Sequence, residues 1–475
     1  MAEGSPTCPA AFPPAAVLRL LDSLELRGAE VHSLLILHRG RTVFEGYSAP
    51  HRVEEPHMLH SLTKVLVNTA VGLLYDRGAL GLEDRVLDYF PAYRPGANAY
   101  LQQLTIRDLL TMRSGQLRRC GGGDWRVLQG SWLEDYFLRV PFQQQPGSRY
   151  VYSSGNSYLL SAIVQQITGR TCHDFLQEAL FPQLGIGGIC WTLSPEGINP
   201  GGNGASLTLR QLARIAALYL EGGRAFGRQL LSQRWVDLSL GRLAYPDGFR
   251  DEGGYNFHWR RREGCWLAGG MYGQTCAIAP QLGTALVMTA ADPADRVEPE
   301  VDRFFQDLAA GGASGEAHWQ ALENRAQRMT LLNRYPAILG ENPLHRGQAV
   351  YRPAENSAGV RRFSLSVEAD AVTCAFWEGD GLHRITAGLN RWREGTSHLG
   401  EWGLHDGYPL AGAAVWAHAR WLDPHTLELI WRFSGTAYWD TVTLCWGPRR
   451  VALTRRSNTC PHRAVTLVGT PDGAL

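Results

Sequence analysis

The stretch that decides the fold is SLTKVLVNTAVGLLYDRG, residues Ser61 to Gly78. Apolar side chains recur through it at helical spacing and Gly78 supplies a stop signal, so we expect a helix with Ser61 at or next to its N-terminus. Lys64 follows Ser61 by three residues, and side chains at i and i+3 share one helix face. The Lys64 amine is therefore expected within reach of the Ser61 hydroxyl.

This pair admits a catalytic and a structural interpretation. A serine hydroxyl becomes a nucleophile when a nearby base takes its proton. A lysine can be that base where its surroundings favour the neutral amine. Free N–H groups at a helix N-terminus can also stabilise an oxyanion. The alternative is that Ser61 is an N-cap and Lys64 a solvated side chain, because Ser-x-x-Lys arises by chance in many proteins.

Two further clusters carry chemistry-bearing residues. The first, YVYSSGN, begins at Tyr150 and precedes an amphipathic helix pattern at 156–169. A tyrosine held near an ammonium has its phenolate favoured and can act as a base, but Tyr152 is equally interpreted as a half-buried aromatic beside a serine cap. The second, AGGMYGQ at 268–274, lies in a strand-like stretch where glycines admit a substrate backbone. Its alternative is a β-bulge or a hairpin turn.

Composition excludes several function classes. The 475 residues suffice for two domains, and a net charge of +1 with 19% charged residues gives no basic excess for nucleic acid. No apolar run is long enough for a membrane span, and the N-terminus lacks a signal-peptide pattern. Nine scattered cysteines without CxxC pairs predict free thiols, which points to the cytoplasm. No histidine pair has metal-ligand spacing and no glycine run is a phosphate loop, so we expect neither metal nor cofactor.

The pattern along the chain predicts two domains. Strands on either side of a turn at 38–40, helices at 106–112 and 207–222, and a strand-like stretch at 265–290 in two pieces fill the first domain. Beyond Tyr351 short β-like runs rich in tryptophan predict a small antiparallel barrel or sandwich, similar to lipocalins. The amino-acid composition changes between these parts, so we place the domains at 1–320 and 321–475.

The ordered set of clusters resembles the serine β-lactamase and penicillin-binding-protein superfamily, and within it the class C β-lactamase-related hydrolases and esterases. The resemblance covers the chain from Val31 to Ala291, and the C-terminal part resembles an appended lipocalin-like domain. The stretches that carry it are LHSLTKVLVNTAVGLLYDRGALGLEDRVLDYFP, LTIRDLLTMRSG, PGSRYVYSSGNSYLLSAIVQQITG and GGNGASLTLRQLARIAALYLEGG.

The resemblance implies an α/β (α+β) domain, with an antiparallel sheet flanked by helices, followed by an all-β, barrel-like domain. It implies a serine hydrolase in which Ser61 is the nucleophile and Lys64 and Tyr152 are the general base and acid. The backbone N–H groups of Ser61 and Met271 would form the oxyanion hole. Two other residues, Ser154 and Gly270, would lie on the substrate side.

Two positions depart from the family pattern. Ala268 stands where the third motif usually has lysine or histidine, and Ser154 stands where asparagine is common. The loss of that cation disfavours substrates with a carboxylate, namely β-lactams and cell-wall peptides, and favours a small ester or amide. Either His258 or Arg260 could replace the cation; the alternative is that both are ordinary strand residues.

Three functions remain open from the sequence. The first is a serine hydrolase acting on a small ester, amide or peptide. The second is acyl transfer, as in related peptide cyclases, or D-amino-acid amidase activity. The third is a non-catalytic binding or regulatory protein with a degenerate third motif. The expected partner is a small molecule, with no nucleic acid and no membrane, and no feature points to an oligomeric state.

Overall fold

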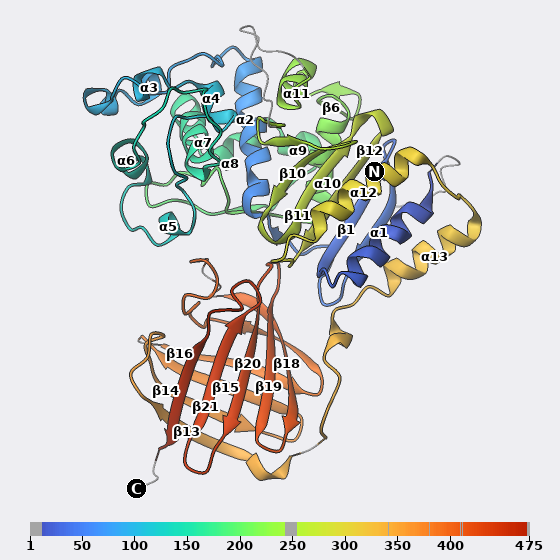
Figure 1. Ribbon diagram of the computed structural model, residues 1–475, viewed down its shortest axis with the longest axis vertical. Coiled ribbons are helices and arrows are strands. Elements are labelled where there is room, and N and C mark those ends of the chain that lie inside the picture. The colour runs from blue at the N-terminus through green and yellow to red at the C-terminus, as the bar shows by residue number, and fades with distance from the viewer. Residues whose placement is uncertain are drawn as a thin grey trace. The chain divides into compact units, whose positions relative to one another are not determined.

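The computed structural model of the protein (Figure 1) describes residues 12–242, 254–340, 342–379, 381–408, 410 and 412–472. The chain divides into two compact units, one made of Met1–Tyr47 with Val53–Met329 and the other of Ser48–Arg52 with Thr330–Leu475. The N-terminal segment 1–11, where we expected no secretory signal, lies outside the described residues. Of the cysteines, the eight in the described part are free, and Cys8 lies outside it.

The first unit contains an antiparallel sheet whose order is not the order of the chain. From one edge it runs β2-β1-β12-β11-β10-β9-β8. The expected hairpin is present, because Arg39 and Gly40 take positive φ angles of 49° and 75° in the turn between the first two strands. The strands are β1 (Val31–His38), β2 (Arg41–Tyr47), β8 (Tyr255–Asn256), β9 (Trp259–Arg261), β10 (Trp266–Gly270), β11 (Gln274–Ala279) and β12 (Thr284–Ala290).

The strand-like stretch at 265–290 forms three strands, where the sequence pattern suggested two pieces. Short turns at Met271–Gly273 and Pro280–Leu282 interrupt it. Each break reverses the chain, so two breaks separate three antiparallel strands. The first of these turns holds the predicted AGGMYGQ cluster at the end of β10.

Side-chain alternation along β1 gives the sheet two buried faces. Leu34 and Ile36 point into one apolar core, and Leu35 and Leu37 point into the other. Helices cover both faces (Figure 1). One face carries α1 (Pro14–Leu26), α12 (Val297–Ala310) and α13 (Glu316–Gln327), and the other core includes α2 (Lys64–Asp76), α7 (Ser154–Thr168) and α10 (Leu209–Leu220).

Helix α13 explains why the first unit ends later than expected. It packs against α1 and β2, and its buried side chains Trp319 and Leu322 belong to the same core as α1. The unit therefore ends at Met329, and the expected boundary at 320 falls inside this helix.

Local capping signals place several helices where the sequence predicts them. Thr105 forms a capping box with Asp108 at the start of α4 (Ile106–Leu110), and Thr208 does so with Gln211 at α10. Helix α7 ends at Gly169 in the left-handed conformation. None of the described helices has the length and apolar character that a membrane crossing requires.

The second unit is a closed β-barrel, in agreement with the predicted barrel-like domain. Neighbouring strands are antiparallel, and a parallel pairing of Gly388 with His418 and Leu389 with Ala419 joins β16 to β18 and closes the barrel. Its strands are β13 (Gly347–Pro353), β14 (Val360–Val367), β15 (Ala371–Glu378), β16 (Gly381–Leu389), β17 (Trp392–Ser397), β18 (Ala413–Asp423), β19 (Thr426–Phe433), β20 (Trp439–Trp446), β21 (Val451–Ser457) and β22 (Val465–Pro471).

A short loop from early in the chain, Ser48–Arg52, belongs to this second unit. The Leu331 N–H donates to the Ala49 carbonyl over 2.8 Å. The Arg52 guanidinium lies 2.8 Å from Glu394 and 5.4 Å from the ring centre of Trp416. These contacts assign the loop to the barrel unit, although it follows β2 directly in the chain.

Candidate active site

The half-buried Ser61 lies in the 3-10 helix η1 (His60–Thr63), three residues before α2 begins at Lys64. Strand β10 packs against this turn. A Cβ atom on Gly270 would lie 2.2 Å from the Leu59 carbonyl oxygen and 3.2 Å from the Leu62 nitrogen. Only glycine therefore allows the end of β10 to approach the turn that carries Ser61.

Lys64 joins three segments of the first unit. Its side chain is buried, and Nζ donates to the Gly202 carbonyl over 2.9 Å, to Ser154 Oγ over 3.1 Å and to Ser61 Oγ over 3.2 Å. A carbonyl oxygen can only accept, so one N–H is committed to Gly202. An ammonium has three N–H groups, so it can donate to all three acceptors.

Tyr152 lies against the same amine. The centre of its half-buried ring is 4.8 Å from Lys64 Nζ. Burial opposes ionisation of the phenol, but the Lys64 ammonium and hydrogen bonds with Lys64 and Ser61 outweigh it and lower the pKa of Tyr152. The structure thus brings together Ser61, Lys64, Tyr152 and Ser154, which the sequence placed in two separate clusters.

His258 does not replace the missing third-motif cation. It is buried, and burial followed by the nearby Lys64 charge lowers its pKa to about 3, so the imidazole is neutral. Its Nδ1 atom lies 2.9 Å from the Lys64 carbonyl and its Nε2 atom 3.2 Å from Ser157 Oγ. The hypothesis of a cationic His258 fails because a buried imidazole beside an ammonium does not accept a second proton.

The third-motif position itself holds no cation. Ala268 is buried within β10. The nearby Arg260 forms an ion pair with Glu298, and its charge also helps to lower the pKa of Tyr152. Met271, at the end of β10, has a side chain that is 43% exposed. The oxyanion role of Met271 and the place of Gly270 on the substrate side stay predictions.

Two contacts around the site were not foreseen from the sequence. One is the Gly202 carbonyl, from a glycine run about which the sequence indicated only that it is not a phosphate loop. A Cβ atom on Gly202 would lie 2.5 Å from Ser154 Cβ. The other is the edge-to-face packing of His60 on Tyr272, with ring centres 5.2 Å apart. Burial, then the charges of His57 and Arg126, lower the pKa of His60 to about 3. The one sign in the sequence that His60 belongs to the site was its position next to Ser61.

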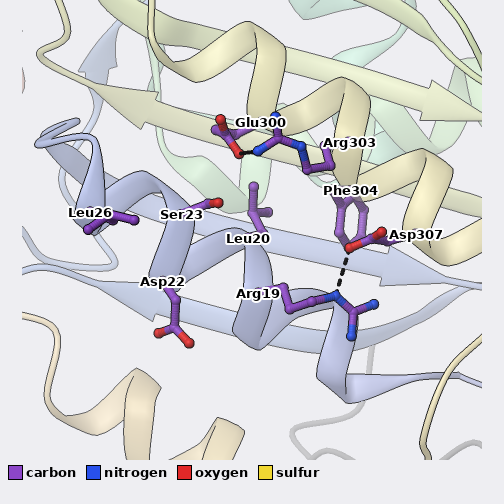
Figure 2. Close-up of a pocket in the computed structure, with 9 residues that line it drawn as sticks. All are labelled: Arg19, Leu20, Asp22, Ser23, Leu26, Glu300, Arg303, Phe304 and Asp307. Atoms are coloured by element: carbon purple, nitrogen blue, oxygen red, sulfur yellow. Dashed lines mark hydrogen bonds and ion pairs between the residues drawn. The ribbon is translucent and has the colours of Figure 1, made fainter.

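A separate groove lies between α1 and α12, with a volume of about 280 Å³. Figure 2 shows two pairs of charged side chains in this groove, Arg19 with Asp307 and Arg303 with Glu300. Arg19 Nε is 2.7 Å from Asp307, and Arg303 Nη1 is 2.8 Å from Glu300. None of the predicted site residues lines this groove. Within the described part of the chain, no three His, Cys, Asp or Glu side chains gather as a metal site would require.

Comparison with known families supplies the context for this geometry. The family model described as Beta-lactamase matches residues 22–311, more than half of the 475 residues. The chain belongs to the beta-lactamase family. This assignment agrees with the resemblance drawn from the three clusters.

One of the relatives matches much of the chain. The 6-aminohexanoate-dimer hydrolase of Paenarthrobacter ureafaciens is 27% identical over 327 residues, which span 62% of this chain and 81% of that protein. Among solved structures, a putative 6-aminohexanoate-dimer hydrolase from Bacillus anthracis superposes with a TM-score of 0.50 at 21% identity, over 60% of this chain and 80% of that one. A class C beta-lactamase superposes with a TM-score of 0.51 at 15% identity, over 62% and 96%. The two structures share the fold of the first unit.

Proposed function

We propose that this protein is a serine hydrolase that forms an acyl-enzyme at Ser61 and cleaves a small ester or amide. The observation that carries the proposal is the single buried amine of Lys64, which lies 3.2 Å from Ser61 Oγ beside the Tyr152 ring. A hydroxyl, a buried amine and a phenol whose pKa is lowered are the parts that acylation requires.

The reaction proceeds in two halves. In the first, the Tyr152 phenolate, favoured by the Lys64 ammonium, takes the Ser61 proton while Oγ attacks the substrate carbonyl. The backbone N–H groups of Ser61 and Met271 stabilise the oxyanion, and Tyr152 gives a proton to the leaving alcohol or amine as its bond to the carbonyl carbon breaks. In the second half, water loses a proton to Tyr152 as it attacks the acyl carbon, and Tyr152 passes this proton to Ser61 Oγ as the acid is released.

The residues around the third motif favour a substrate that places no carboxylate there. Ala268 offers no charge, and the Arg260 guanidinium is paired with Glu298. Binding a carboxylate there would require Arg260 to leave that ion pair. A neutral ester or amide avoids this cost. The 27% identical relative named for the 6-aminohexanoate dimer supports a linear amide with a terminal carboxylate as a second substrate to test.

The experiment compares turnover of a p-nitrophenyl ester, the 6-aminohexanoate dimer and a chromogenic β-lactam by the wild type, Ser61→Ala and Lys64→Met. We expect the wild type to cleave the ester or the dimer faster than the β-lactam, and both variants to lose activity by at least about 10²-fold. Equal rates for the wild type and both variants would refute the proposal. Product analysis with an added amine distinguishes hydrolysis from acyl transfer.

A further inference from the structure

His258 lies between the two helices that carry the catalytic motifs. It sits in the turn between β8 and β9, where its own φ angle is +71°, and its side chain is only 4% exposed. Its Nδ1 atom lies 2.9 Å from the backbone carbonyl of Lys64 in α2, and its Nε2 atom lies 3.2 Å from the hydroxyl of Ser157 in α7.

The partners of the ring fix its protonation. The Lys64 carbonyl can only accept a hydrogen bond, so Nδ1 must carry a proton and donate it. In the neutral ring Nε2 is then an acceptor, and the Ser157 hydroxyl donates a hydrogen bond to it. The lowered pKa of His258 agrees with this single tautomer.

These contacts link Lys64 in α2 to helix α7 in two ways, through Ser154 and through His258. Ser157 lies three residues after Ser154 on α7, so both side chains share one helix face. Ser154 Oγ accepts from Lys64 Nζ over 3.1 Å, while the backbone of Lys64 accepts from His258. The imidazole therefore spans α2 and α7 at the level where Lys64 must meet Ser61.

We propose that His258 is a positioning residue that fixes the spacing of α2 and α7 and so holds Lys64 Nζ against Ser61 and Ser154. This inference rests on the proposed function at Ser61. Small displacements of a catalytic group reduce the rate strongly because the reacting atoms must meet in a narrow geometry. His258 touches no reacting atom, and it acts through the backbone of Lys64.

The test separates the hydrogen bond at Nδ1 of His258 from the hydrogen bond at Nε2. His258→Leu removes both hydrogen bonds, and we expect kcat to fall by about 10- to 100-fold with little change in KM. His258→Asn places an amide N–H near the position of Nδ1, so it can still donate to the Lys64 carbonyl and should restore most of kcat. Ser157→Ala removes only the α7 end and should give a smaller loss than His258→Leu.

His38→Leu is the matched control. His38 is also buried, with Nδ1 2.9 Å from Thr284 Oγ1, but it lies at the far end of β1 and β12 from the Ser61 turn. We expect this variant to lower the melting temperature without lowering kcat. Ester turnover and melting temperature are measured for all four variants and the wild type.

The outcomes separate this inference from the proposed function. If His258→Leu keeps wild-type kcat, or if His258→Asn is no better than a folded His258→Leu, the positioning role is wrong while the hydrolase proposal stands. If His258→Leu does not fold, the other two variants test the positioning role. Wild-type kcat in Ser157→Ala, together with a full loss of kcat in His258→Asn, would overturn that role. A wild type that neither turns over ester nor is labelled at Ser61 overturns both proposals.

Discussion

Lys64 Nζ lies 3.2 Å from Ser61 Oγ, 3.1 Å from Ser154 Oγ and 2.9 Å from the Gly202 carbonyl oxygen. The three N–H groups of an ammonium match these three acceptors. The charge of Lys64 also favours the phenolate of Tyr152, whose ring centre lies 4.8 Å from Nζ.

The first prediction concerns pH. The active form in acylation contains the Tyr152 phenolate, so kcat/KM should rise with pH through a pKa below 10, because the Lys64 ammonium favours the phenolate. Replacing Lys64 by Met removes that charge and should move the rising limb of the residual activity to higher pH. Ester hydrolysis measured across the pH range checks this. If the activity of Lys64→Met rises at the same pH as that of the wild type, Lys64 does not set the ionisation of Tyr152.

The second prediction concerns the close approach at Gly270. An added Cβ atom would meet the backbone of Leu59 and Leu62, which cannot move aside without displacing the Ser61 turn. Gly270→Ala should therefore lower kcat by about 10²-fold or more. Gly187→Ala is the control, because a Cβ atom at Gly187 meets no atom within 4 Å. Equal ester turnover by the two variants would contradict the account.

The third prediction concerns the buried His60. Its pKa in the folded protein is about 3, against 6.5 for an ordinary histidine. Between those values the unfolded chain binds one more proton than the folded chain, so lowering the pH lowers stability by about 1.4 kcal/mol per pH unit for this group. The effect is absent at higher pH and levels off below the folded pKa.

Replacing His60 by Leu removes this proton difference. The free energy of unfolding of the first unit, measured by chemical denaturation at about pH 7 and about pH 5, should then depend less on pH in the variant. The same slope in both proteins would mean that His60 is not held neutral in the folded state.

The fourth prediction concerns the barrel. Asp440 is fully buried between Arg455 Nε at 2.7 Å and His405 Nε2 at 2.8 Å. Asp440→Asn leaves the buried Arg455 charge without its partner, so it should destabilise the barrel unit by about 3–5 kcal/mol. The exposed pair of Arg52 and Glu394 supplies the comparison, and Glu394→Gln should cost less than about 1 kcal/mol. Similar losses in denaturant titrations of the two variants would contradict this.

Features with local signals followed from the sequence. The helices expected at 106–112, 156–169 and 207–222 are present. Their ends, at the Thr105 and Thr208 capping boxes and at Gly169, depend on residues within one helical turn, so short patterns suffice to place such helices. Ser61 and Lys64 lie three residues apart, and their contact followed from helix geometry alone.

Features that depend on tertiary contacts did not follow. The Gly202 carbonyl reaches Lys64 across 138 residues, and a backbone acceptor leaves no mark in residue type. His258 suggested a cation by its chemistry, but burial beside Lys64 keeps it neutral. The stretch that forms α13 was interpreted as a helix or a linker at the domain boundary, and the buried Trp319 and Leu322 anchor this helix in the first unit.

The central claim is that Ser61 is a nucleophile activated by Lys64 and Tyr152. Its most direct test is treatment of the wild type, Ser61→Ala and Lys64→Met with a fluorophosphonate, followed by peptide mass spectrometry to locate the adduct. The account predicts one adduct on Ser61 in the wild type, none in Ser61→Ala and much slower labelling in Lys64→Met. An unlabelled wild type, or an adduct on another residue that survives in Ser61→Ala, would contradict it.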